Sequence, residues 1–261
     1  MNRLLLAFLL LFPSIVFSQP KPIVLCMDDN WFPYTIFEDG ETKGIHTKVI
    51  KHALDELGYT YHIKPKPWKR CLLDLENGKV DAVFPASYKA SRAEIGFYPP
   101  EAATDAISPW RLSQVEHALI THSGTAYDYD GDISSIPQPI GMGLAGAFTD
   151  TLEKKGLKVK RNRTAKANIE MLMRGRIKSV SMAPLQAAEF LSSEKYSQFL
   201  KQHKLPLRSK SYFLIFAKNT HLSKKERLLI WNAIAKTRCN ENLMPFLIYK
   251  YFKSALDDIS E

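Results

Sequence analysis

The sequence predicts an α/β fold made of two similar α/β lobes. Short apolar runs rich in β-branched residues, which are typical of strands, alternate with segments whose apolar residues recur at helical spacing. The alternation restarts near Pro137, and the pattern of residues 75–83 recurs at residues 172–180. In both stretches a helix end is followed by glycine, a basic residue, a β-branched residue and a strand. This order favours parallel pairing within each lobe.

The composition is that of a folded globular protein. The 261 residues are 45% hydrophobic and 24% charged, which argues against long disorder, collagen and coiled coil. The length suits one large domain or two small ones. The net charge of +9 permits an anionic partner without requiring one.

Residues 1–18 are expected to be a signal peptide rather than part of the fold. A positive start at Arg3 precedes an apolar run over residues 4–17, which is short for a membrane span of ~20 residues. Val16 and Ser18 place small residues before a cut at Ser18-Gln19. The alternative is an uncleaved anchor. No cysteine follows the run, so no lipid anchor is indicated, and we expect an exported protein.

The elements of the first half follow from periodicity and helix stops. Strands are expected at residues 23–27, 60–64 and 80–84, and helices at residues 45–57 and 69–76. Gly58 and Gly78 follow the two helices, in the position where glycine commonly ends a helix. The segment from Asp28 to Tyr34 is expected to be a loop.

The second half repeats this order and ends in helices. Strands are expected at residues 140–144, 157–160, 177–182 and 212–217, and helices at residues 149–155 and 167–174. Ser223 and Glu226 have the spacing of a capping box, which predicts the first of two C-terminal helices. Pro245 lies inside the last apolar stretch, so the final helix is expected to start afresh around it.

Several motifs occur in a characteristic order along the chain. They are Trp31-Phe-Pro-Tyr34, residues 38–44 ending in Gly44, Leu57-Gly58, Pro67-Trp-Lys-Arg70, residues 75–82, Ser87 through Arg92-Ala93, Phe97-Tyr-Pro99 and Gly175-Arg-Ile177. With them the chain resembles the periplasmic solute-binding proteins of family 3, which serve polar amino-acid ABC transporters. The P-W-x-R form at residues 67–70 is typical of a branch whose ligands are often unassigned.

The resemblance implies the type II periplasmic-binding fold, with two hinge strands near residues 115–121 and 211–216. Lobe one would hold residues 19–115 and 215–261, and lobe two residues 116–214. One small solute would bind between the lobes and be delivered to an ABC permease or a membrane sensor. The resemblance further implies a periplasmic monomer that has no cofactor, no metal, no catalytic residues and no nucleic-acid partner.

Arg92 is the strongest candidate ligand residue. By resemblance it is the arginine that grips the ligand carboxylate, and its planar donors suit two carboxylate oxygens better than lysine does. Ser87, five residues earlier, would add a hydroxyl or backbone donor. The alternative for Arg92 is a surface arginine on a polar loop.

Other lobe-one candidates stand near expected strand ends, where open α/β sheets bind ligands. Trp31 and Trp68 would stack on an apolar or planar part of the ligand, although packing in the lobe core is an alternative. Tyr34 is a weaker candidate of the same kind. Asp28 would favour a cationic or hydrogen-bond-donating group, unless it serves only a turn. Arg70 is either a second anion donor or a salt-bridge partner.

Lobe two offers fewer side chains and departs from the family pattern. Ala147, Phe148 and Thr149 open a helix whose free N–H groups would form an anion site. Ala183 stands where the family's amino-acid binders have the acid that holds the ligand ammonium, and Lys178 replaces another expected acid. His46 and Lys48 replace an acidic pair after Gly44. A carboxylate or another polar, partly aromatic solute is therefore as open as an α-amino acid.

Two other functions remain open. One is a periplasmic dehydratase on the same scaffold, resembling cyclohexadienyl dehydratase, which would need a general acid such as Glu38, Asp105 or Glu189. None of these acids stands in a recognisable partner motif, and no nucleophile triad or metal-ligand pattern is evident. The other is a periplasmic interaction module with a degenerate cleft.

Cysteine spacing and one basic segment complete the expectations. Cys26, Cys71 and Cys239 form no C-x-x-C pair, which disfavours a structural zinc site. This pattern is compatible with three small buried hydrophobic residues, and equally with one disulfide and a free thiol. A Cys26–Cys71 bridge is one option in an oxidising compartment. Residues 153–178 hold most of the excess positive charge and are expected to lie away from the ligand, as a solvated face or as a docking surface for an acidic partner.

Overall fold

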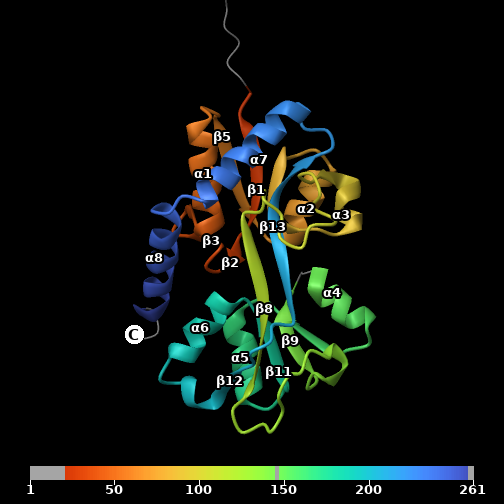
Figure 1. Ribbon diagram of the computed structural model, residues 1–261, viewed down its shortest axis with the longest axis vertical. Helices are drawn as coiled ribbons and strands as arrows, with labels where there is room; N and C mark the ends of the chain where they lie inside the picture. The colour runs from red at the N-terminus through yellow and green to blue at the C-terminus, as the bar shows by residue number, and fades with distance from the viewer. Residues whose placement is uncertain (1–20, 145–146, 258–261) are drawn as a thin grey trace, which may run out of the picture.

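The computed structural model describes residues 21–144 and 147–257 and consists of two α/β lobes stacked along the long axis (Figure 1). The predicted fold class is confirmed. The predicted signal peptide, residues 1–18, lies outside the described residues. No helix among the described residues is long and apolar enough to cross a membrane.

Lobe one is built on a parallel sheet whose central strand is β1 (Ile23–Asp28). β5 (Tyr61–Lys66) and β6 (Ala82–Ser87) pair with it on either side. The other elements of the first half are α1 (Ile45–Glu56), α2 (Trp68–Glu76), α3 (Ala90–Ile95) and β7 (Gly96–Phe97). All predicted strands and helices of this half are present, with bounds that differ by at most three residues.

Lobe two repeats the arrangement around β9 (Ile140–Gly143). β10 (Val159–Asn162) and β11 (Ser179–Met182) both pair parallel to it. The remaining elements are α4 (Ala147–Lys154), α5 (Ala165–Met173), α6 (Pro184–Ser192), β12 (Leu200–Gln202) and the short 3₁₀ turns η1 (Ile133–Ser135) and η2 (Ser197–Phe199). The repeat seen in the sequence therefore corresponds to a repeat of structure.

Two long antiparallel strands connect the lobes: β8 (Ser113–His122) and β13 (Arg208–Ala217). β8 also pairs with β11 and β12 in lobe two, whereas β13 pairs with β6 and β7 in lobe one. The two strands run side by side through the middle of the molecule (Figure 1). The predicted hinge segments lie within them.

A small antiparallel sheet begins in the segment predicted to be a loop, residues 28–34, and continues to Lys43. It consists of β2 (Asn30–Trp31), β3 (Thr35–Glu38) and β4 (Glu41–Lys43). These strands are only two to four residues long, too short for a period-two pattern to stand out. Gly44, which follows, has φ 106°, and a Cβ there would lie 2.4 Å from the Tyr34 carbonyl oxygen, so only glycine fits.

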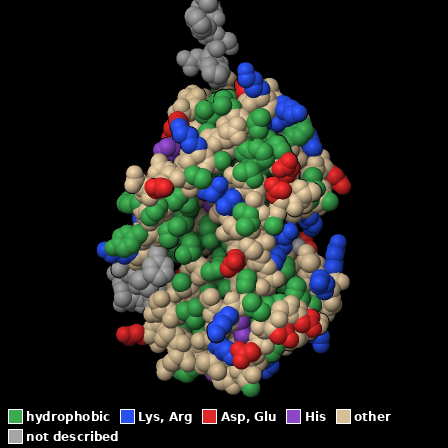
Figure 2. Space-filling model, viewed as in Figure 1, with side chains coloured by type: hydrophobic (Ala, Val, Ile, Leu, Met, Phe, Trp, Pro, Cys, Tyr) green, Lys and Arg blue, Asp and Glu red, His purple; other side chains and the backbone are tan. Residues whose placement is uncertain are grey.

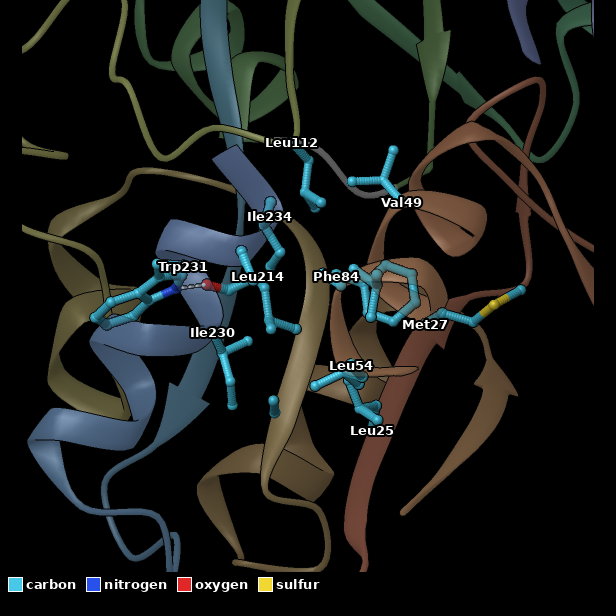
Figure 3. Packing of buried hydrophobic residues seen from close by; sticks show 14 of the residues in the cluster. Leu25, Met27, Val49, Leu54, Phe84, Leu112, Leu214, Ile230, Trp231 and Ile234 are labelled. Carbon is cyan, nitrogen blue, oxygen red and sulfur yellow. Dashed lines mark hydrogen bonds between the residues drawn. The ribbon is translucent and has the colours of Figure 1, made fainter. Parts of the chain in front are cut away.

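The lobe-one core packs α1 and α7 (Lys224–Arg238) against the sheet (Figure 3). Leu25 and Phe84 from the strands are fully buried in one cluster with Leu54 of α1 and Ile230 of α7. The Trp231 indole Nε1 donates to the Leu214 carbonyl oxygen at 2.8 Å, which satisfies its polar atom inside the core. This packing fixes the strand ends that face lobe two.

Both C-terminal helices predicted from the sequence are present. Ser223 and Glu226 form the predicted capping box of α7. α8 (Leu243–Asp257) begins two residues before Pro245, which lies in the first turn, where no backbone N–H donor is needed. α8 lies against α1 and α7 of lobe one and α6 of lobe two (Figure 1).

A disulfide joins Cys26 of β1 to Cys71 of α2, and both residues are buried. Their Cα atoms are 5.4 Å apart, within the usual range for a disulfide. Cys239 is exposed and is not in a disulfide. Of the alternatives left open by the sequence, the structure has one disulfide and one free thiol.

Candidate functional site: the cleft between the lobes

A cavity of about 430 Å³ lies between the lobes, beside the crossing strands. Its lobe-one side is formed by residues at the carboxyl ends of β1 and β6, and its lobe-two side by residues at the ends of β9 and β11. A volume of this size suits a small-molecule ligand. The position, outside the carboxyl ends of parallel strands, is where α/β sheets bind ligands.

Most of the predicted ligand residues line this cavity. They are Asp28, Trp31, Trp68, Ser87 and Arg92 from lobe one and Thr149 from lobe two. They come from separate parts of the chain and meet only because each follows a strand end or opens a helix. Residues near strand ends therefore form the lobe-one side of the cavity, as the sequence predicted.

Arg92 is held by neutral partners. Its side chain is buried, with 8% of its surface exposed, and Nη1 donates to the Ser87 carbonyl oxygen at 3.0 Å. The guanidinium carbon lies 5.5 Å from the centre of the Trp68 ring. Within the described part of the chain no carboxylate lies within 4.0 Å of it. A buried guanidinium without an acidic partner favours binding an anion.

Trp31 and Tyr34 have different positions relative to the cavity. Trp31 lines it, and its ring centre is 4.7 Å from those of both Tyr34 and Tyr212. Tyr34 lies behind Trp31, buried and stacked on His46 at 4.7 Å. Burial raises the pKa of Tyr34. The turn between β2 and β3 directs Tyr34 into the interior, so Trp31 alone of the pair lines the cavity.

Arg70 and Phe148 do not line the cavity, and the side chain of Ala147 is not described. Arg70 is exposed because Trp68 and Cys71 take the buried face of α2. Phe148 is buried in lobe two, where the Arg208 guanidinium carbon lies 4.3 Å from its ring centre. Thr149, the next residue of α4, lines the cavity.

Further lining residues were not predicted from the sequence. His117 and Tyr212 come from the crossing strands, and Ser181, Met182, Asn168 and Gln186 come from lobe two. The crossing strands were expected, but no motif in them indicates which positions face the ligand. Strand pairing between β8 and β13 decides this.

Burial shifts the pKa values of two titratable groups in the cavity. Burial raises the pKa of Asp28 to about 6, with the charge of Asp29 adding to the shift and backbone hydrogen bonds opposing it. Burial also lowers the pKa of His117 to about 3, and the positive charge of Arg208 lowers it further. His117 is therefore a neutral donor or acceptor at physiological pH.

An ion-pair network crosses from lobe one to lobe two at the edge of the cavity. Arg161 pairs with Asp150 at 2.9 Å and with Glu153 at 2.6 Å, and Lys89 of lobe one pairs with Asp150 at 2.8 Å. Arg161 and Arg163 line the cavity, so the expectation that the basic segment lies away from the ligand residues is wrong for these two. Other Lys and Arg side chains gather at the right edge beside α4 (Figure 2).

The lobe-two side of the cavity carries no acidic lining residue in the described part of the chain. Ala183 lines it at the position where an acid was expected, because it caps α6 directly after β11. The carboxylates that line the cavity are Asp28 and Asp29 of lobe one. Glu38, Asp105 and Glu189, the acids considered for a dehydratase, do not line it. The described residues contain no cluster suited to a metal ion.

Known proteins match the chain in sequence over its first part and in fold over its length. Residues 23–108 match the family model described as bacterial extracellular solute-binding proteins, family 3. A comparison with curated proteins finds no match.

Three solved structures illustrate the likeness in fold. The amino acid ABC transporter substrate-binding protein AbpA of Streptococcus pneumoniae, bound to L-arginine, has a TM-score of 0.68 and 18% identity, covering 90% of this chain and 96% of that one. The arginine-, lysine-, histidine-binding protein ArtJ of Geobacillus stearothermophilus has a TM-score of 0.67 and 18% identity, covering 92% and 100%. The unliganded, open L-cystine solute receptor of Neisseria gonorrhoeae has a TM-score of 0.58 and 14% identity, covering 89% and 92%.

At these identities the structural likeness shows the fold, and the sequence match to the family model is confined to residues 23–108. The matched range contains Trp31, Trp68 and Arg92, which line the cavity. The chain therefore matches the model of family 3 of the bacterial extracellular solute-binding proteins over residues 23–108, and it has the fold of solved substrate-binding proteins over about 90% of its length.

Proposed function

We propose that this protein captures a small, carboxylate-bearing solute between its lobes and delivers it to an ABC transporter. The observation that carries the proposal is Arg92, a buried guanidinium that lines the cavity and has only neutral partners among the described residues. A ligand carboxylate would complete its pairing with two parallel hydrogen bonds.

The arrangement of the lobes supports capture by closure. Residues of both lobes line one cavity, and the connection between them is the pair of crossing strands. Two-lobed binding proteins close around such connections by hinge motion. In this proposal lobe one comprises residues 19–115 and 215–261, lobe two comprises residues 116–214, and the protein works as a periplasmic monomer.

The charges that line the cleft favour a carboxylate over an α-amino acid. An α-ammonium group would find no carboxylate on the lobe-two side in the described part of the chain. Asp28 offers a contact for a cationic or hydrogen-bond-donating part from lobe one. Trp31, Trp68 and Tyr212 offer apolar surface for the body of the solute.

Thermal unfolding in the presence of small acids and amino acids tests the proposal. At least one carboxylate is expected to raise the melting temperature by several degrees, because a ligand that binds only the folded state stabilises it. Arg92→Ala is expected to abolish that rise. Arg174→Ala, which removes an exposed arginine of lobe two, serves as the matched control and is expected to keep it.

Two results would contradict this function. One is that no carboxylate or amino acid shifts the melting temperature of the wild-type protein. The other is that Arg92→Ala shows the same shift as the wild type. Turnover of a supplied substrate such as prephenate would instead support an enzyme.

A further inference from the structure

One corner of the cavity, on its lobe-two side, lies where β10 ends and α5 begins. Arg163, Thr164, Ala165 and Asn168 line the cavity there, and we call these four residues the α5 corner. Arg92 lines the same cavity from lobe one. A solute that fills the cavity can therefore contact Arg92 and the α5 corner at the same time.

Asn168 is the buried polar side chain of the α5 corner. Only 3% of its surface is exposed, and it packs so closely on β9 that a Cβ at Gly141 would lie 2.7 Å from its Oδ1. Asn162 Nδ2 donates to Asn168 Oδ1 at 2.7 Å, which fixes the orientation of the amide. Asn168 Nδ2 has no hydrogen-bond partner among the described residues. This buried amide group is therefore a free donor at the wall of the cavity.

The first turn of α5 adds further donors. Thr164 caps the helix, because its Oγ1 accepts from the Ala167 backbone nitrogen at 3.1 Å, and its own hydroxyl hydrogen remains free to donate. The Ala165 N–H has no partner within the described part of the chain, as is usual for the first residue of a helix. The partial positive charge at a helix N-terminus adds to the attraction of these donors for an anion.

Arg163 supplies a full positive charge to the α5 corner. It is exposed, and no carboxylate of the described residues lies within 4.0 Å of it. Arg161 also lines the cavity, but its charge is already balanced by Asp150 and Glu153. The carboxylates in the described lining belong to lobe one, so none of them competes for the donors of the corner.

We infer that the solute carries a second anionic group, carboxylate or phosphate, which binds at the α5 corner while Arg92 binds the first carboxylate. This inference rests on the proposed function of the cleft. An apolar end would leave the Asn168 amide without an acceptor, and a neutral polar end would leave the charge of Arg163 unpaired. Because Arg92 and the α5 corner belong to different lobes, a solute with an acid at each end would also favour the closed state.

Calorimetric titration with diacids and their half-amides tests the inference. The probes are succinate, glutarate and adipate with the half-amides succinamate, glutaramate and adipamate. A half-amide keeps one carboxylate and the size of the diacid but lacks the second charge. 3-Phosphonopropionate, compared with succinamate, distinguishes a phosphate-like second group from a carboxylate. At least one dianionic probe is expected to bind tenfold or more tightly than its half-amide.

Two variants of the α5 corner and one control locate the effect. Arg163→Gln is expected to weaken the best dianionic probe by about 10-fold and its half-amide by about twofold or less. Arg176→Gln removes another exposed arginine of lobe two that does not line the cavity, and it is expected to bind every probe within about twofold of the wild type. Asn168→Asp replaces the buried donor by an acceptor and is expected to reverse the preference in favour of the half-amide.

The inference can fail without the proposed function. Equal affinity of the wild type for diacids and half-amides would overturn it while leaving solute capture intact. Equal losses for both probes in Arg163→Gln, or the same loss in Arg176→Gln, would also overturn it, because the charge would then act without a specific contact. Thermal unfolding without ligand checks that Asn168→Asp folds; if it does not, Arg163→Gln decides. If no probe binds the wild type, this inference fails, and the thermal-unfolding screen with other acids decides carboxylate capture separately.

Discussion

At the scale of single residues, the cleft is distinguished by a buried arginine that lacks an acidic partner. Arg92 has no carboxylate within 4.0 Å among the described residues, whereas Arg161 pairs with two. Arg92 was predictable because it belongs to a motif with Ser87. His117 was not, since only the pairing of β8 with β13 decides which positions of the crossing strands face the cavity. Site residues that belong to motifs can be identified from the sequence. Site residues whose position depends on long-range strand pairing cannot.

The buried carboxyl of Asp28 gives a pH-dependent contribution to stability. Its pKa is raised from the unfolded value near 3.8 to about 6, so the folded state holds the proton more tightly than the unfolded state. Stability from this group is therefore full below about pH 3.8 and is lost as the pH rises through 6. Asp28→Asn is expected to raise the ligand-free melting temperature by a few degrees at pH 7.5 and to leave it nearly unchanged at pH 3.5.

Asp132→Asn is the control, because the pKa of Asp132 is shifted in the opposite direction from that of Asp28. Hydrogen bonds from the Ser134 side chain and backbone lower the pKa of Asp132, so its ionised form stabilises the fold. That variant is expected to melt lower at pH 7.5. If Asp28→Asn melts below the wild type at pH 7.5, the carboxyl is not destabilised by burial and the account of this group is wrong.

At the scale of elements, the helices and strands with a clear hydrophobic periodicity were predicted from the sequence. Those without such a periodicity were missed. α1 and α2 carry apolar stripes that end at Gly58 and Gly78, and both helices are present as expected. The small sheet β2–β4 was missed because its strands are too short to show alternation. Helix α6 was missed although Pro184 stands at its first position, a common helix start.

The disulfide is an element-scale constraint, because it ties β1 to α2 across a separation of 45 residues. Replacing both cysteines, in Cys26→Ala with Cys71→Ala, is expected to lower the free energy of unfolding by about 2–4 kcal/mol, measured by urea denaturation. Cys239→Ala is expected to change it by less than about 0.5 kcal/mol, since that thiol is exposed and outside the disulfide. Equal stability of the double variant and the wild type would show that the bridge contributes nothing in solution.

At the scale of the whole molecule, one continuous sheet path passes from lobe two through β8 and β13 into lobe one. The internal repeat predicted two lobes, and the resemblance predicted two connecting strands. The position of α8 was not predictable, because its contacts with α6 join segments far apart in the sequence. Three connections hold the lobes around the cavity: the crossing strands, helix α8 and the Lys89–Asp150 pair.

The central claim is that this cavity holds a carboxylate-bearing solute through Arg92. Native mass spectrometry of protein purified without denaturant tests it most directly, because a solute retained in the cleft adds its mass to the protein. The account predicts that the wild type carries a small acid, which is released on unfolding, and that Arg92→Ala carries none. An Arg92→Ala protein that retains the same solute, or a wild type whose retained solute has no acidic group, would contradict it.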